Sequence, residues 1–472
     1  MSLFFRDGLI WTAEGLRPAG VRVSGGRVVS ILEPGLPPPP GALIVEAQGL
    51  WLLPGGVDAH VHGRDPGWPE KEDFDSLTSA AAAGGVTCVA DMPNTRPATD
   101  DGEALIEKAQ QIGARARIDF ALWGGIRSST DADRLESLAA AGAVGFKAYL
   151  GYAFNLKARN FVYSPEVPDP DFEEPAGYGT LAKLAGSLAR IGRTVAVHAE
   201  DASVLRACRG DVYSYEDLLA SRPAAAEAVA VAALGAISMT EGLAIHVPHL
   251  SSAAGLECAR RGRAAGARLT LETCPQYLYL DSDDFVRAGS LMRMNPPVRR
   301  PADREALVEA LRVGEIDLVA TDHAPHTDLQ KLTAGLGEAE PGNPGVQLLY
   351  LTALDLARRF GDPSRAPVWV SEAPARLLGI WPQKGSLEPG ADADIVLVDP
   401  AGSSRVEPTG MFSRQRHSPL EGRSFGFSVE KVYSRGELVF DRGRLVGPTG
   451  RGRLVRPGAK DQPGGNPHLS AR

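Results

Sequence analysis

Residues 54–64, PGGVDAHVHGR, form the segment from which the fold and the chemistry of the chain can be worked out. Its apolar residues alternate with Asp58, His60 and His62, which is typical of a β-strand, because successive side chains point to opposite faces. The alternation places these three residues, and with them Arg64, on one face. Two neighbouring imidazoles can bind one zinc ion, although the same pattern fits two polar residues on a solvent-exposed face. The remaining ligands must come from elsewhere in the chain.

Composition excludes several classes of protein. The chain has 472 residues, 43% hydrophobic and 23% charged, which is ordinary for a globular protein with one large and one smaller domain. A net charge of −8 gives no basic surface, so we expect no nucleic-acid partner. No apolar run approaches the ~20 residues of a membrane-spanning helix, and we expect no membrane partner. The four scattered cysteines lack a Cys-x-x-Cys pair and the N-terminus lacks a signal-peptide core, which indicates a cytoplasmic protein.

Between its two ends the chain alternates apolar strands with helices. Strands are predicted at residues 51–62, 86–93, 117–126, 143–150, 194–200, 243–250, 268–274 and 316–323. Helices are predicted at residues 72–83, 101–113, 131–141, 179–190, 224–240, 253–265, 302–313, 345–360 and 371–379. Eight such units favour an α/β fold of the (β/α)8 TIM-barrel type. The alternative, a doubly wound sheet, lacks a Gly-x-Gly-x-x-Gly turn after the first strand.

Short strand-like runs occur at both ends of the chain. We expect them to pair into one small β-sandwich domain made of residues 1–53 and 384–450, with the barrel at 54–383. Residues 451–472, rich in Gly, Pro and Arg, are predicted to be a loosely ordered tail.

Polar residues gather at the carboxyl ends of the predicted strands, where a barrel carries its chemistry. These residues are His60, His62, Asn94, Lys147, His198, His249 and Asp322. Four of the nine histidines therefore lie at three strand ends. We interpret His246 as a packing or hydrogen-bonding residue, His323 as pointing away from the site, and His417 and His468 as surface residues.

Lys147 is unusual among them, since an ammonium cannot bind a cation. A lysine in a buried strand normally implies a paired charge. A neutral amine can instead capture CO₂ as a carbamate, whose two oxygens could bridge two metal ions that share one hydroxide. Asp322 could then bind a metal ion and accept the proton of the attacking hydroxide.

With these residues in place, the chain resembles the cyclic amidohydrolases of the amidohydrolase superfamily. The resemblance runs from residues 54–62 through 321–326, TDHAPH, to 384–394, KGSLEPGADAD. It implies a (β/α)8 barrel with a small β domain, and hydrolytic opening, or closure, of a cyclic amide. It also implies two divalent metal ions, for which we expect zinc. His60 and His62 would bind one ion, His198 and His249 would bind the other, carbamylated Lys147 would lie between them, and Asp322 would be ligand and base. We expect a homo-oligomer, a dimer or a tetramer.

Several motifs resemble dihydroorotase, the enzyme of pyrimidine biosynthesis that interconverts N-carbamoyl-L-aspartate and L-dihydroorotate. These are Arg64 with residues 65–67, DPG, and then 92–97, MPNTRP, 295–299, NPPVR, and His326. Dihydroorotate carries a carboxylate, which an arginine fork matches with two hydrogen bonds. Arg64, Asn94, Asn295 and His326 would then hold the carboxylate and the ring edges. The alternative for Arg64 is a salt bridge at the barrel mouth.

Other features resemble allantoinase and dihydropyrimidinase or hydantoinase, which would share the metal site. Lys147 and His198 lie 51 positions apart, residues 220–223 read ASRP, and residues 345–347 read GVQ. Gln276 stands where the wider family usually has histidine. The proline-rich segment 154–176 is predicted to form a lid. A non-catalytic paralogue that assembles with partner enzymes is a further alternative, but such proteins usually lose metal ligands. Deacetylase or adenosine deaminase-like chemistry finds no support in the contexts of Asn94 and Asn295.

Overall fold

The computed structural model describes residues 2–163, 169–332 and 335–458 of the chain. Its centre is a set of short, buried, parallel strands that follow one another along the sequence. They are β6 (Gly56–Val61), β7 (Val86–Asp91), β8 (Asp119–Leu122), β9 (Gly124–Gly125), β10 (Phe146–Tyr149), β14 (Val195–His198), β15 (Ile245–Val247), β16 (Leu269–Thr273) and β17 (Leu318–Val319). They pair in the orders β6-β7-β8 and β9-β10-β14-β15-β16-β17. The α/β expectation is thus confirmed.

Backbone contacts link the two groups of strands. Trp123 alone separates β8 from β9. At the other end, the amide of His62 donates a hydrogen bond of 2.7 Å to the carbonyl oxygen of His323, and Val61 forms a parallel bridge with the same residue. The strands are shorter than the sequence predicted, and Asn94, His249 and Asp322 lie in the loops that follow them.

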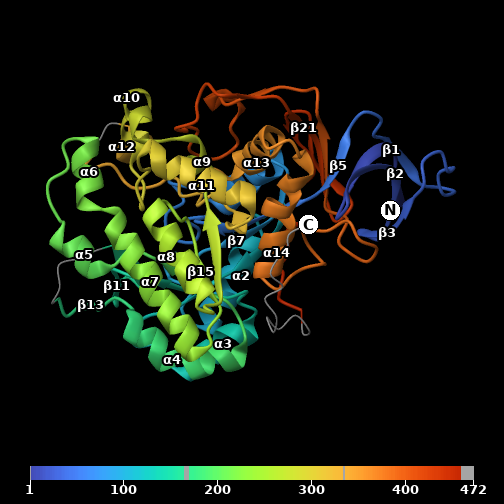
Figure 1. Cartoon of the computed structure of the whole chain (residues 1–472). Helices are drawn as coiled ribbons and strands as arrows, with labels where there is room; N and C mark the ends of the chain where they lie inside the picture. Colours follow the sequence, from blue (N-terminus) through green and yellow to red (C-terminus); the bar gives the residue numbers. More distant parts are fainter. Residues whose placement is uncertain (1, 164–168, 333–334, 459–472) are drawn as a thin grey trace.

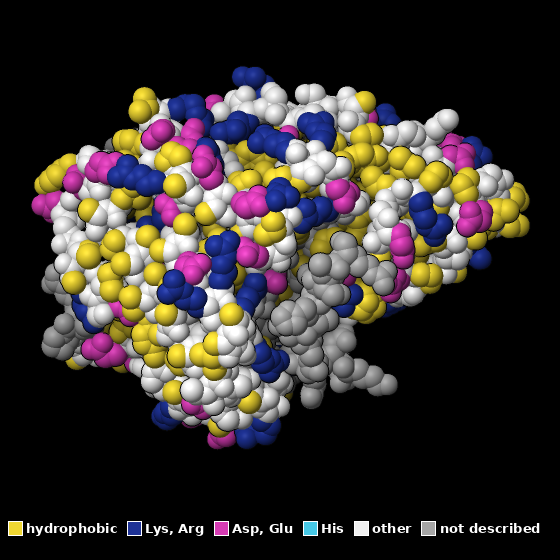
Figure 2. All heavy atoms as spheres, in the orientation of Figure 1, with side chains coloured by type: hydrophobic (Ala, Val, Ile, Leu, Met, Phe, Trp, Pro, Cys, Tyr) yellow, Lys and Arg dark blue, Asp and Glu magenta, His cyan; other side chains and the backbone are white. Residues whose placement is uncertain are grey.

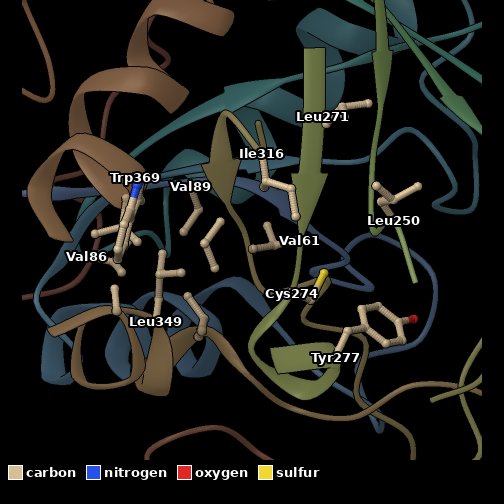
Figure 3. Packing of buried hydrophobic residues seen from close by; sticks show 14 of the residues in the cluster. Val61, Val86, Val89, Leu250, Leu271, Cys274, Tyr277, Ile316, Leu349 and Trp369 are labelled. Atoms are coloured by element: carbon tan, nitrogen blue, oxygen red, sulfur yellow. The ribbon is translucent and has the colours of Figure 1, made fainter. Parts of the chain in front are cut away.

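Helices follow most of the strands and cover them (Figure 1). They are α1 (Phe74–Ala83), α2 (Gly102–Gly113), α3 (Ala132–Ala141), α4 (Tyr178–Ile191), α5 (Ala202–Ala207), α6 (Tyr215–Ser221), α7 (Ala224–Glu241), α8 (Ala253–Ala264), α9 (Pro275–Tyr279), α10 (Phe285–Ala288), α11 (Pro301–Val313), α12 (Asp328–Lys331), α13 (Leu349–Arg359) and α14 (Ala373–Leu377). Asp73, Asp101 and Asp131 cap α1, α2 and α3, each accepting a hydrogen bond from a backbone amide of the first turn. Side chains such as Leu349 and Trp369 pack near Val86 of β7 in the core (Figure 3).

The two ends of the chain meet in a second sheet, of nine strands, beside the helices (Figure 1). Its order is β23-β22-β21-β18-β5-β1-β2-β3, with β4 paired to β1. The strands are β1 (Ser2–Thr12), β2 (Gly15–Ser24), β3 (Arg27–Leu32), β4 (Leu43–Glu46), β5 (Trp51–Pro54), β18 (Ile395–Asp399), β21 (Ser428–Ser434), β22 (Glu437–Asp441) and β23 (Arg444–Leu445). β5 pairs antiparallel with β18, which joins the N-terminal to the C-terminal strands. The terminal segments were expected to form a β-sandwich, but their strands are hydrogen-bonded into one continuous sheet.

A buried lysine ties this sheet to the parallel strands. The Lys384 ammonium lies 2.5 Å from Asp119 Oδ2 in β8, and 3.0 and 2.9 Å from Asp392 Oδ2 and Asp394 Oδ2 just before β18. The pKa of Lys384 is raised, since these carboxylates outweigh the cost of burial. An ion pair this buried depends on all its members, because any partner left alone is a desolvated charge.

Two expectations about the later part of the chain were wrong. The start of the predicted loose tail is ordered against β8: Leu454 forms a parallel bridge with Phe120, and Val455 is buried. His468 and the rest of that tail from residue 459 lie outside the described residues. His417, predicted to be on the surface, is buried and lies with its Nδ1 3.1 Å from Asp328 Oδ1.

A small antiparallel sheet lies in the segment predicted to form a lid. It consists of β11 (Tyr152–Asn155), β12 (Asn160–Tyr163) and β13 (Phe172–Glu173), in the order β12-β11-β13. Residues 164–168 of that segment lie outside the described residues. Side chains of β11 and β12 help to line the cavity described below.

Among the described residues, one stretch, Tyr215–Glu241, is long and apolar enough to cross a membrane. It is two helices, α6 and α7, interrupted at Arg222 and Pro223, and α7 packs its buried face, including Val231 and Leu234, into the core. On the face shown in Figure 2, basic and acidic side chains are interspersed.

Candidate active site

Three of the predicted ligands converge at the ends of β6 and β17. The Nε2 atoms of His60 and His62 lie 3.4 and 3.1 Å from Asp322 Oδ1. One ligand atom from each of these residues falls within 4.8 Å of the other two. Two neutral imidazoles and one carboxylate in such a group can hold a divalent metal ion.

The outward-facing nitrogens of this pair are each fixed by another side chain. His60 Nδ1 lies 2.8 Å from Glu272 Oε1, and His62 Nδ1 lies 2.7 Å from Asn94 Oδ1. Each imidazole therefore donates its Nδ1 proton outward and presents its Nε2 lone pair to the centre of the site. Asn94, predicted to bind substrate, orients a candidate metal ligand, a role that the sequence did not reveal.

His198 and His249 form a second pair. Their rings are 4.8 Å apart, with His198 Nδ1 facing His249 Nε2 at 3.0 Å. His198 Nε2 lies 2.9 Å from the buried carboxylate of Glu200, which leaves Nδ1 as the coordinating atom. The His60 ring lies 5.3 Å from the His249 ring, so the two pairs adjoin.

The four histidines of the two pairs and Asp322 line one cavity, and Lys147 lines it too. Its side chain is fully buried, and among the described residues its Nζ has neither a hydrogen bond nor a salt bridge. The paired charge that usually explains a buried lysine is thus missing from the described part of the chain. Burial lowers the pKa of Lys147 to about 8, which makes the neutral amine accessible near neutral pH.

Electrostatics favour the ligand forms of the other residues. Burial lowers the pKa of His62 to about 4, and it also lowers the pKa of His198 and of His249. Burial alone would raise the pKa of Asp322, but the facing rings of His60 and His62 outweigh it and lower that pKa. Burial therefore favours the neutral, metal-binding forms of His62, His198 and His249 beside an ionised Asp322.

The backbone is strained at three residues that line the cavity. Arg64, His249 and Asp322 have φ values of 59°, 42° and 50°, in the left-handed region that side chains other than glycine rarely adopt. Each lies in the loop two or three residues after a strand: Arg64 after β6, His249 after β15 and Asp322 after β17. Such strain persists only where surrounding structure enforces it, and it clusters at functional sites.

The cavity, of about 330 Å³, is lined by two cations, Arg64 and Lys71, and by Glu340, whose Oε1 lies 3.8 Å from Lys71 Nζ. There Arg64 Nη2 lies 3.1 Å from His326 Nε2, and Lys71 Nζ lies 3.1 Å from His326 Nδ1. Burial and then the two cations lower the pKa of His326 well below its usual value, so this imidazole is neutral. Arg64 also donates to the carbonyl oxygen of Pro325, but it has no salt bridge among the described residues. The salt-bridge interpretation of Arg64 therefore finds no support there.

The remaining predicted substrate residue, Asn295, lines the same cavity, and both polar atoms of its side chain are buried without a partner among the described residues. Sequence reasoning missed Tyr149 and Tyr152, which also line it. It missed Glu272 as well, whose signal is a lone acid inside the apolar strand β16. Gln276 donates to the Thr321 carbonyl oxygen and lines a smaller cavity behind Asp322.

The donor set fits the metal ions that the resemblance implies. Among the described residues, Lys147 Nζ and His249 Nδ1 have no hydrogen-bond partner, and together with the nitrogens that face inward they belong to one buried cluster. His246 is no part of it, because its Nε2 lies 3.1 Å from Glu272 Oε2. His323 likewise points away, toward Glu72.

Comparison with known proteins identifies the family. The model of the amidohydrolase family matches residues 51–439. The chain belongs to the amidohydrolase family. Within it, the chain is 37% identical to an allantoinase of Streptomyces avermitilis over 96% of this chain and 98% of that protein. It is also 37% identical to an allantoinase of Rubrobacter xylanophilus, over 88% and 89%.

Solved structures agree with the sequence relatives. An L-hydantoinase (dihydropyrimidinase) from Arthrobacter aurescens superimposes with a TM-score of 0.87 at 27% identity, covering 96% of this chain and 99% of that one. A dihydropyrimidinase from Brevibacillus agri gives a TM-score of 0.84, also at 27% identity, over 97% and 99%. These relatives confirm that this amidohydrolase is related to the cyclic amidohydrolase group and is a hydrolase of cyclic amides. They favour the allantoinase and hydantoinase alternative over dihydroorotase.

Proposed function

We propose that this amidohydrolase opens the ring of a five-membered cyclic ureide of the allantoin and hydantoin class, using two divalent metal ions. The observation that carries the proposal is the cluster itself: His60, His62 and Asp322 adjoin the His198 and His249 pair in one cavity. The relatives named allantoinase, matched over nearly the whole chain, support this ring class over a dihydropyrimidine ring.

The proposal includes the architecture that would hold the site. We infer that the parallel strands close into a (β/α)8 barrel, which the hydrogen bond from His62 to His323 supports because it joins the first strand to the last. The structural likeness to the L-hydantoinase of Arthrobacter aurescens and the dihydropyrimidinase of Brevibacillus agri supports the same arrangement. A closed barrel would bring the carboxyl ends of all its strands to one mouth.

The proposed ligands are His60 and His62 for one ion, His198 and His249 for the other, and Lys147 as a carbamate between them. The buried Lys147 amine has no hydrogen bond or salt bridge among the described residues, and its pKa is lowered; both observations support the carbamate, since only a neutral amine reacts with CO₂. When bound, zinc ions would polarise the ring carbonyl and activate water at neutral pH.

The side chains of the protein orient and move the other groups. Glu272, Asn94 and Glu200 fix the tautomers of His60, His62 and His198 by accepting their outward protons. Asp322 is ionised and lines the cavity, so it can take the proton of the attacking water and pass it to the ring nitrogen as the amide C–N bond breaks. The products are a carboxylate and an amide nitrogen that carries the transferred proton.

Side-by-side turnover of allantoin, hydantoin, dihydrouracil and dihydroorotate by the zinc-loaded protein tests the proposal. We expect kcat/KM to be highest for allantoin or hydantoin. Preference for dihydrouracil or dihydroorotate would refute the ring class, and absence of turnover with all four would refute the proposed activity.

Dihydroorotase is a second candidate, and one observation favours it. Arg64 is a half-buried guanidinium on the cavity wall without a salt bridge among the described residues, as a site for a carboxylate-bearing ring requires. Asn295 and His326 line the same cavity. The turnover series separates the two candidates directly.

A further inference from the structure

A continuous line of contacts runs from the small antiparallel sheet at the cavity to a candidate metal ligand. Tyr163, the last residue of β12, accepts a hydrogen bond from Arg222 Nη1, and Arg222 Nη2 donates to Glu200 Oε2. The same carboxylate oxygen lies 2.9 Å from His198 Nε2. The Arg222 guanidinium also lies over the Tyr163 ring, with its central carbon 4.8 Å from the ring centroid.

Arg222 is well placed to hold this line rigid. It is 3% exposed, in the break between α6 and α7, and its carbonyl oxygen accepts a hydrogen bond of 3.0 Å from Arg299. Glu200 is fully buried, and Arg222 is the cation that it contacts. Without that cation Glu200 would be a desolvated charge, and its bond to His198 would no longer be fixed in direction.

The sheet also touches the same imidazole directly. The Tyr152 ring of β11 lies edge-on to the His198 ring at 5.4 Å and to the Tyr163 ring at 5.0 Å. Tyr152 and Tyr163 face each other in the β11–β12 pairing. His198 is thus held from one side by a ring of the sheet and from the other by a carboxylate that the sheet reaches through Arg222.

We propose that Arg222 is a positioning residue that couples the β11–β12 hairpin to metal binding at His198 and His249. The inference rests on the proposed two-metal site. Because coupling between two sites is reciprocal, the hairpin should favour metal binding at this pair, and metal binding should in turn stabilise the hairpin. The ion at His60, His62 and Asp322, whose outward nitrogens are fixed by other residues, should depend less on Arg222.

The test is a zinc titration of metal-free protein against a chromophoric chelator, for the wild type, Arg222→Met and Tyr163→Phe. We expect Arg222→Met to weaken one of two ions by 10- to 100-fold, the usual effect of losing a residue that supports a ligand. Tyr163→Phe, which keeps the ring and loses the hydroxyl, should weaken the same ion by less. Arg263→Met is the matched control, because Arg263 pairs with Asp317 at the opposite ends of β16 and β17.

Hydrogen–deuterium exchange of the β11 and β12 amides gives a second readout that does not depend on activity. Zinc should slow exchange in the hairpin of the wild type and of Arg263→Met, and it should do so less in Arg222→Met. If a folded Arg222→Met binds both ions with wild-type affinity, the coupling is overturned while the two-metal site stands. If Arg222→Met does not fold, wild-type affinity for both ions in Tyr163→Phe has the same meaning. A wild type that binds one ion would overturn the two-metal site, and the coupling with it.

Discussion

Replacing Glu272 by glutamine tests how the two halves of the site are held together. One carboxylate accepts hydrogen bonds from His60 Nδ1 at 2.8 Å, His246 Nε2 at 3.1 Å and the backbone amide of His249 at 3.1 Å. Two of these three donors belong to candidate metal ligands, one from each pair. Glutamine keeps the shape of the side chain and removes its charge.

The magnitude follows from the lost charge. A hydrogen bond to a charged group contributes about 1.5–3 kcal/mol, against about 0.5–1.5 kcal/mol for a neutral one. Weakening the bonds to His60 and His249 by about 1 kcal/mol each gives about 2 kcal/mol, or roughly a 30-fold loss of zinc affinity. His246 can tolerate the change, because its Nδ1 has no partner among the described residues and the ring can exchange tautomers.

The assay is zinc affinity by chelator competition, together with kcat/KM for the preferred ring substrate. Glu227→Gln is the control, because Glu227 is an equally buried acid that bonds to Ser251 and Ser252 and to none of the histidines. A folded Glu272→Gln whose affinity and kcat/KM stay within threefold of the wild type would refute the reasoning.

Three other outcomes are expected. Lys147→Met should abolish turnover yet stabilise the metal-free protein below pH 8 by about 3 kcal/mol, because burial lowers the folded-state pKa from 10.5 to about 8. Between pH 8 and 10.5 the unfolded wild type binds more protons than the folded one, so its free energy of unfolding should rise with pH, and urea titrations of the variant should lack that rise. Lys384→Met should lower the free energy of unfolding by about 3–5 kcal/mol, since it leaves Asp119, Asp392 and Asp394 without their buried cation; a loss below 1 kcal/mol would contradict this. Arg64→Ala should reduce kcat/KM roughly 100-fold for a ring that bears a carboxylate and less than tenfold for allantoin, and equal losses for both rings would show that Arg64 does not read the carboxylate.

The alternation of strands and helices, and the residues at the strand ends, could be predicted because both depend on local pattern. Strand periodicity placed His60 and His62 on one face, and each predicted barrel helix lies within a few residues of an observed one. The same logic identified His198, His249, Lys147 and Asp322, all of which line one cavity in the structure.

The supporting residues could not be predicted in this way, because their roles depend on contacts between distant segments. Glu272 reaches His60 across 212 positions, and Asp58, on the same strand as His60, accepts a hydrogen bond from Thr321. His417 resembled a surface residue because nothing local shows that residues 411–420 pack against the rest of the chain. Ring preference was the least predictable feature, since motifs of two related enzymes occur in one sequence.

The pairing of β5 with β18 has a consequence for the order in which the protein can fold. Trp51–Pro54 leads into β6 within two residues, yet its partner Ile395–Asp399 is synthesised about 340 residues later. Pairing of such distant segments is slow, because a long loop must close before any contact compensates for its entropy. A nascent chain that ended before Ile395 would carry every proposed metal ligand, while the strand next to His60 and His62 would lack its antiparallel neighbour. Synthesis of Ile395–Asp399 would therefore limit how early this enzyme can become active.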